Sequence, residues 1–219
     1  GQVGKKISYS VVETVPNGYE NSQQWSADNP VIVNTMQETS LSVSKSWTDS
    51  LPSVHDDVAS VTYQLQRSTG ESWSDVGSAQ AVPTSSTPES YTWENLPTYS
   101  AAGKEYAYRA IETAVTLTAA AGGSTINVVP AADLTSGTVG GFDYASTTTG
   151  SNLSGWTTAI TNSARVTSVS ATKAWADDSN RDGVRPESVT FHLWQGTDAN
   201  SMTQLDSTYD KVLSDQVAH

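Results

Sequence analysis

The sequence predicts an all-β sandwich, organised as one complete domain flanked by two partial domains that complement each other. Wherever apolar residues cluster, they recur at every second position, which is typical of half-buried strands. The chain has 7 Trp and only 2 Phe, with abundant Ser and Thr, and this mixture favours short strands over helices. Its 219 residues allow one large domain or two small ones, either of which can bury a core.

The first expected strand covers residues 6–13, and a second strand ends at Asn34. The same pair recurs later in the chain, as residues 105–112 and a strand that ends at Asn162. The first member of each pair closes on a Tyr-x-x-x-Glu pattern. We interpret this match as an internal repeat at the level of single strands.

Two further expected strands carry a Lys followed two residues later by a Trp. One covers residues 41–47 and the other covers residues 169–175, with the same alternation of apolar and small polar residues. A second alternating strand follows each of them at the same distance along the chain, beginning at Val61 and at Val189. The two copies therefore share a register.

The key residues follow the order Glu, Asn, Lys, Glu, Asn, Lys along the chain. This order predicts the C-terminal part of one domain in residues 1–37, a complete domain in 38–165 and the N-terminal part of a further domain in 166–219. Joining the tail to the head would give a domain that lacks only the equivalent of residues 91–99. The Gly-, Ala- and Thr-rich stretch between 115 and 141 predicts an extra hairpin or long loop.

Composition excludes several classes of function. A formal charge of −12 and a pI near 4.4 argue against binding to nucleic acid or anionic lipid. The absence of Cys excludes a disulfide framework and a thiolate metal site. No apolar run predicts a membrane span, and Gly1 opens no signal-peptide pattern. We therefore expect an internal excerpt of an exported protein with a soluble surface.

Several segments in register carry a resemblance to a known family. They are 43–47 and 171–178, which look like the family's first strand, 185–193, which looks like its next, 91–97, which looks like its Trp-x-x-Leu-Pro segment, and 12–19, which looks like its Glu-containing strand and turn. They resemble the Cna protein B-type repeat, an Ig-like module of Gram-positive surface adhesins and pilins. The resemblance implies an Ig-like sandwich in a structural stalk, at an extracellular site on a bacterial surface, with the full-length parent anchored to the cell wall.

The resemblance also implies an isopeptide bond between a first-strand Lys and a last-strand Asn, promoted by a Glu. In the complete set these residues are Lys45, Asn162 and the catalytic Glu112. In the split set they are Lys173, Asn34 and the catalytic Glu13. The bond would form once in each domain, so we expect no enzyme with turnover.

The residues of the complete set support this chemistry on physical grounds. Alternation places Lys45 on the inward face, where burial should lower the pKa of its amine and make it a nucleophile. Glu112 also points inward, which favours the protonated carboxyl that could polarise the Asn162 amide. The plainer alternative is a buried Lys–Glu ion pair that forms no bond.

The split set predicts contact between chains. Entry and exit strands of tandem Ig-like domains leave from opposite poles, so we expect the tail of one chain to complete the head of a neighbouring copy, head to tail. A host extracellular-matrix ligand is expected only through other domains. Two other hypotheses stay open, namely an adhesin module that itself binds a host ligand and an engineered split protein that ligates itself.

Other candidate sites are weaker, and we expect no metal and no cofactor. Residues 177–183 have the composition of a calcium loop, but a polar turn explains them better. The three His residues have no spacing suited to zinc or to a catalytic triad. Four Trp residues could form a sugar-binding platform, although aromatic residues on strands more often fill the core. These residues are His55, His192 and His219, and Trp25, Trp73, Trp156 and Trp194.

Overall fold

The computed structural model describes residues 4, 7–48, 55–85, 89–165, 167–196 and 200–214. The chain divides into two compact units, residues 1–167 and residues 168–219. The regular structure of both units is mostly strand, and the described helices are short 3₁₀ turns, at His55–Asp57 (η1), Ala119–Ala121 (η2) and Ser207–Tyr209 (η3). The predicted all-β class is confirmed.

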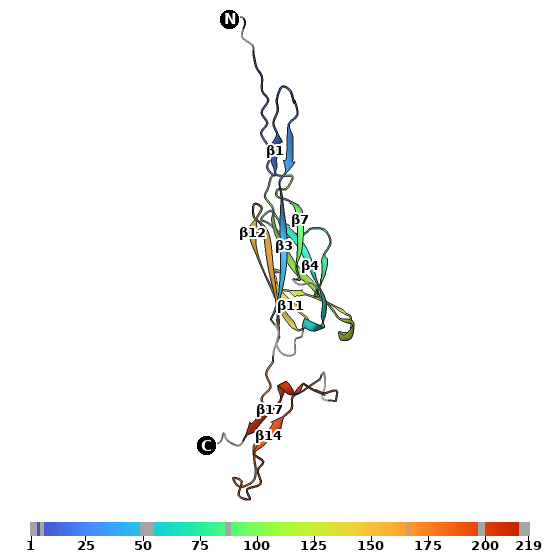
Figure 1. Cartoon of the computed structure of the whole chain (residues 1–219), viewed down its shortest axis with the longest axis vertical. Helices are drawn as coiled ribbons and strands as arrows, with labels where there is room; N and C mark the ends of the chain where they lie inside the picture. The colour runs from blue at the N-terminus through green and yellow to red at the C-terminus, as the bar shows by residue number, and fades with distance from the viewer. Residues whose placement is uncertain are drawn as a thin grey trace. The chain divides into compact units, whose positions relative to one another are not determined.

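The centre of the first unit is a sandwich of two sheets, which is the predicted Ig-like architecture. Figure 1 shows β3, β4, β7 and β12 of this domain extending along a common direction. The first sheet contains, in order, β10 (Val129–Pro130), β11 (Ser136–Val139), β12 (Phe142–Ser151), β13 (Gly155–Ala164), β3 (Glu38–Thr48) and β7 (Tyr91–Pro97). The second contains β5 (Ser74–Asp75), β4 (Val58–Ser68), β8 (Ala107–Leu117) and β9 (Thr125–Asn127), with β6 (Gln80–Pro83) also paired to β4.

The first and last long strands of this domain, β3 and β13, are neighbours and run parallel. Their register places Lys45 opposite Ile160 and Trp47 opposite Asn162. All the other strand pairs of the two sheets are antiparallel. The parallel pairing brings the two ends of the domain sequence together in the middle of one sheet.

The core lies between the two sheets and is filled by the inward residues of alternating strands. In β3, for example, Leu41 and Val43 are fully buried, while Ser44 between Val43 and Lys45 is exposed. Strand β8 crosses behind β3, β12 and β13 and lies close to all three. The main buried apolar residues are Leu41, Val43, Val58, Val61, Tyr63, Leu65, Tyr108, Ala110, Val115, Val139, Phe142, Tyr144 and Ile160.

The stretch between 115 and 141 forms two short pairings. Strand β9 folds back on β8 after η2, and β10 pairs with β11, which continues the first sheet from β12. Gly122 ends η2 in the left-handed region, with φ +100°, a conformation in which a side chain would be strained. The extra hairpin expected from the sequence is therefore present, and a second one accompanies it.

The described part of the leading segment contains one hairpin, formed by β1 (Tyr19–Gln23) and β2 (Val33–Met36). The strand expected over 6–13 is not found in its described part, because residues 7–16 carry no strand pairing. Its counterpart β8 is held between β4 and β9. A strand needs such partners to satisfy its backbone hydrogen bonds, and none of the described strands pairs with 7–16. Residues 5 and 6 lie outside the described part.

The second unit contains β14 (Ser188–Phe191) paired with β17 (Lys211–Ser214), and β15 (Trp194–Gln195) paired with β16 (Thr203–Gln204). The strand expected over 169–175 is also extended chain without strand pairing. Its counterpart β3 lies between β13 and β7. The described part of this unit offers no equivalent of either neighbour, which explains the difference.

Candidate functional site

Three strands bring Lys45, Glu112 and Asn162 to one point inside the sandwich. Lys45 comes from β3, Asn162 from the adjacent β13 and Glu112 from β8 in the facing sheet. The Glu112 carboxyl accepts from both of the others. Lys45 Nζ lies 2.7 Å from Oε2, and Asn162 Nδ2 lies 2.8 Å from Oε1. The carboxyl therefore bridges the amine and the amide.

The bridge is removed from solvent. The side chains of Lys45 and Glu112 are each 0% exposed, and Asn162 is 0% exposed as a residue. The part of Lys45 that solvent reaches is its backbone, since its side chain is fully covered. Burial lowers the pKa of Lys45 below its ordinary value of 10.5, and the nearby carboxylates of Glu112 and Glu89 oppose that shift. Removing an ammonium from water favours its neutral form.

Aromatic side chains enclose the site. Lys45 Nζ lies 4.3 Å from the centre of the Trp47 ring. That ring contacts Phe142 edge-on at 5.0 Å and stacks with His55 at 5.3 Å, and its Nε1 donates to Glu89 Oε2 at 2.9 Å. Trp47 thus covers the amine and is itself fixed on several sides.

Two tyrosines line the site near Glu112. Tyr63 is its register partner on β4, and burial, followed by the charges of Glu112 and Glu89, raises the Tyr63 pKa. Tyr144 is the register partner of Asn162 on β12, and its hydroxyl accepts from the Glu112 backbone N–H at 3.3 Å. Neither residue is among those that the sequence predicts for the site, although the alternation of Phe142 with Tyr144 was a usable signal.

Asn162 is left with one unsatisfied atom. Its Oδ1 is buried and has no hydrogen-bond partner among the described residues, an arrangement that costs about 1–3 kcal/mol. A half-turn of the amide would aim Oδ1 at Glu112, and a protonated Glu112 could then donate to it. The same atom would be the one polarised if an amine attacked the amide carbon.

The second set is divided between the two units. In the first unit Asn34 Nδ2 donates to Glu13 Oε1 at 2.8 Å, and Asn34 Oδ1 is buried without a described partner, as in Asn162. Beside them is a hollow of about 140 Å³. In the second unit the Lys173 Nζ lies 4.3 Å from the centre of the Trp175 ring, the same distance as between Lys45 and Trp47. Each half thus repeats one contact of the central site, but Glu13 and Lys173 are exposed, whereas the side chains of Glu112 and Lys45 are buried. The hollow is lined by Val11, Val12, Glu13, Val15, Asn21, Gln24, Trp25 and Ile32.

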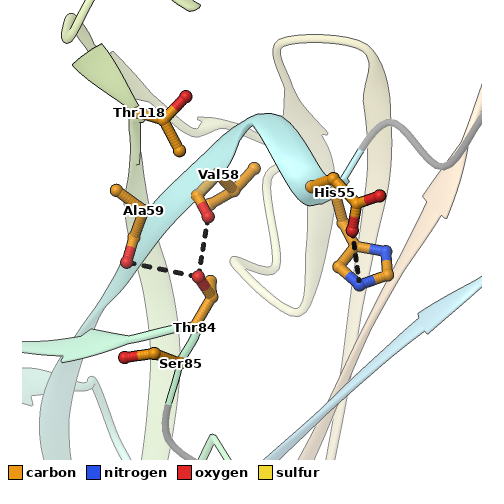
Figure 2. A pocket seen from close by; sticks show the side chains of 7 residues that line it. His55, Val58, Ala59, Thr84, Ser85 and Thr118 are labelled. Atoms are coloured by element: carbon orange, nitrogen blue, oxygen red, sulfur yellow. Dashed lines mark hydrogen bonds and ion pairs between the residues drawn. The ribbon is translucent and has the colours of Figure 1, made fainter. Parts of the chain in front are cut away.

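A second hollow, of about 380 Å³, lies beside η1 (Figure 2). His55 borders it and approaches Asp56 at 3.9 Å, and the Thr84 hydroxyl donates to the carbonyl oxygens of Val58 and Ala59 at 2.7 and 3.3 Å. This set offers no nucleophile next to a base. We assign it no chemistry.

The weaker candidates gain little from the structure. Asp177 accepts from Arg185, which lowers the Asp177 pKa, and it caps the turn at Asn180. No group of three acidic or His side chains in the described ranges could hold a metal ion. Trp156 packs against the core and Trp73 covers Arg109, with 4.3 Å between ring centre and guanidinium. His192 approaches Asp210 at 2.9 Å, while His219 lies outside the described residues.

Several solved structures resemble the chain. The first contains two B repeat units of the collagen binding protein Cna of Staphylococcus aureus, with 25% identity and a TM-score of 0.37, and the match covers 95% of this chain and 48% of that one. A single B repeat unit of the same protein has 21% identity and a TM-score of 0.34, and the match covers 81% of this chain and 76% of that one. The pilus adhesin SpaC of Lactobacillus rhamnosus GG has 15% identity and a TM-score of 0.35, and the match covers 84% of this chain and 20% of that one. The chain thus spans about half the length of the first of these.

Comparison with curated protein sequences finds no match. In the described part of the chain, none of the helices is long and apolar enough to cross a membrane. The model of the Cna protein B-type domain matches residues 41–128 and again residues 169–214, which together make up more than half of the sequence. The chain belongs to the Cna protein B-type domain family.

Proposed function

We propose that this chain is a load-bearing part of the stalk of a Gram-positive surface adhesin or pilin, stabilised by self-made Lys–Asn isopeptide bonds. The observation that carries the proposal is the buried Glu112 carboxyl, which accepts from both Lys45 and Asn162 at 2.7 and 2.8 Å. An ordinary buried ion pair needs no amide in contact with the same carboxyl. Family membership is consistent with the extracellular, wall-anchored setting that this role requires.

The reaction begins with transfer of a proton from the Lys45 ammonium to Glu112, which a site without water favours because it removes both charges. Glu112 then donates to Asn162 Oδ1 and makes the amide carbon more electrophilic. The neutral amine attacks that carbon, the new C–N bond forms and the bond to Nδ2 breaks. Protons relayed through Glu112 let Nδ2 leave as neutral ammonia, and the proton that Lys45 first gave up stays on Glu112, which ends as the protonated carboxyl.

The product is an amide that joins β3 to β13 in the middle of one sheet. Each site can react once, so the process is a maturation step and gives no catalytic turnover. No cofactor or metal enters the scheme. Recognition of a host extracellular-matrix ligand is assigned to other domains of a longer surface protein.

Intact-mass spectrometry tests the proposal. The chain should be lighter than its sequence predicts by one ammonia for the central bond, and peptide mapping should find Lys45 joined to Asn162. Glu112→Gln should restore the missing mass, while the matched variant Glu94→Gln, on an exposed residue of β7, should not. A full sequence mass in the wild-type chain would eliminate the cross-link.

We further propose that the split set joins neighbouring copies of the chain head to tail. Both outer parts expose apolar side chains of the kind that the central domain buries. Glu13 and Asn34 already form their hydrogen bond, and Lys173 already lies on Trp175. The exposed apolar residues are Ile7, Tyr9, Val11, Val12, Val31 and Val33 in the leading segment and Val169, Trp175, Val184, Trp194, Val212 and Leu213 in the second unit.

Sedimentation velocity and denaturing gels test this second proposal. The wild-type chain should form larger species as its concentration rises, and a ladder of covalent multimers should persist in denaturant. Lys173→Arg should abolish the ladder and leave the central ammonia loss intact. Lys104→Arg, at an exposed Lys paired with Glu71, is the matched control. A chain that stays monomeric at every concentration would contradict the head-to-tail joining, but it would leave the proposal for the central bond untouched.

A further inference from the structure

The leading segment meets the central domain at a joint built around one connecting residue. Gln37 is the only residue between β2 and β3. Its N–H donates to the Gly18 carbonyl at 2.7 Å, and its own carbonyl accepts from Thr98 N at 3.2 Å and from Thr98 Oγ1 at 3.0 Å. The connector is therefore bound on both sides, to the hairpin that it leaves and to the domain that it enters.

A close contact between two turns completes the joint. Gly18 is buried with φ +85°, and a Cβ on it would lie 2.9 Å from the Cβ of Tyr99. Asn17 Nδ2 also donates to the Gly103 carbonyl at 3.4 Å. Only a glycine fits here, for two independent reasons, namely the positive φ and the approach of Tyr99.

The receiving turn is itself held in place. Tyr99 forms an isolated bridge with Glu105, and Tyr106 N donates to the Thr98 carbonyl at 2.9 Å. The Tyr108 hydroxyl donates to the Pro97 carbonyl at 2.6 Å and ties the end of β7 to the core strand β8. A contact with this turn is thus a contact with the body of the domain.

The other end of the central domain repeats part of this arrangement. Arg165, the residue after β13, donates its N–H to the Gly141 carbonyl at 2.8 Å, as Gln37 does to Gly18 after β2. Gly141 immediately precedes β12, as Gly18 precedes β1. Gly141 is exposed, whereas Gly18 is buried beneath Tyr99. The hairpin that ends the central domain, β12–β13, thus has a counterpart in β1–β2 of the leading segment. In the leading segment, the end of the following domain packs against this hairpin.

We propose that the contact of the Gly18 turn and Gln37 with the Thr98–Tyr99 turn is a specific docking interface that fixes the orientation of one B-type unit on the next. The partner that this surface fits is the entry pole of another unit of the same kind. The interface uses backbone hydrogen bonds and shape, so it does not require the isopeptide bond. It extends the proposed stalk function by explaining how successive units are held in line.

Distance measurement between two spin labels tests the interface in the full-length chain. The sequence has no Cys, so Cys residues introduced at exposed Asp28 and Thr147 are labelled alone. The expected wild-type result is one narrow distance distribution. Gly18→Ala should lose this single population, while Gly70→Ala should keep it. Gly70 is the matched control because its φ is +104° and a Cβ there meets nothing within 4 Å.

A second variant and a second measurement keep the test decisive if Gly18→Ala folds poorly. Tyr99→Ala removes the ring without straining the backbone and should also broaden the distribution. The ammonia deficit of each variant should stay at its wild-type value, which separates failure of the joint from failure of the proposed cross-link. A broad distance distribution in the wild-type chain would overturn the proposal. So would a distribution that stays narrow in both Gly18→Ala and Tyr99→Ala.

Discussion

Asn162→Ala removes the amide that the proposed bond needs and leaves the Lys45–Glu112 ion pair in place. The variant loses one hydrogen bond to Glu112, which contributes about 1 kcal/mol. It also removes the buried Oδ1, which has no partner among the described residues. These two effects oppose each other. The dominant change should therefore be loss of the covalent link between β3 and β13.

The size of that change follows from the loop that the bond closes. Lys45 and Asn162 enclose about 120 residues, and a cross-link around such a loop lowers the entropy of the unfolded chain enough to stabilise the fold by about 5 kcal/mol. A domain of about 130 residues has an unfolding entropy near 0.27 kcal/mol/K. The midpoint of thermal unfolding of the central domain should fall by about 15–20 °C in Asn162→Ala.

Calorimetry of both chains measures this shift, with intact mass recorded on the same samples. Thr158→Ala is the matched control, because Thr158 lies on the same strand, is equally buried and accepts from Ala110 N–H. Thr158→Ala should keep the ammonia deficit, and its free energy of unfolding should fall by only about 1–3 kcal/mol. Coinciding midpoints for wild type and Asn162→Ala, with the deficit present in the wild type, would refute the entropic reasoning.

Three other predictions concern the site and its surroundings. In Asn162→Ala the free energy of unfolding should rise with pH between the lowered pKa of Lys45 and 10.5, because there the unfolded chain binds a proton that the folded chain does not. The proposed bond would turn the Lys45 amine of the wild type into an amide, so pH-dependent denaturation should show a smaller slope there. Trp47→Leu should cost about 2–4 kcal/mol and slow the loss of ammonia after refolding, since it uncovers the amine; an unchanged rate in time-resolved mass spectra would argue against this role. Lys173→Arg should remove a second ammonia deficit from multimers, and a deficit that persists would place that bond elsewhere.

The sequence predicted the sandwich well because its strands carry their own signal. Alternation at Leu41 and Val43, and at Val61 and Leu65, corresponds to the buried faces of β3 and β4. The positions of Lys45, Glu112 and Asn162 on inward faces follow from the same periodicity. The structure supplies the distances between them, whereas their chemical roles stay a prediction.

Other features could not be predicted because they depend on pairing. Residues 6–13 and 169–175 have strand-like sequences, but a strand forms only where neighbours satisfy its backbone. The described parts of both segments carry no strand pairing. The enclosing groups Tyr144 and Glu89 were also missed, since no local pattern tells which side chains from distant strands meet around one amine.

The spacing of the proposed bonds decides how the chain would respond to pulling. Asn34 and Lys45 stand about eleven residues apart along β2, Gln37 and β3, which spans ~35 Å when extended. With both bonds closed, tension would pass through this short segment. The roughly 120 residues between Lys45 and Asn162 would lie outside the force-bearing path and carry no tension. The ~400 Å of hidden length that such a loop could release would stay locked, and the fibre would behave as a cord of nearly constant length.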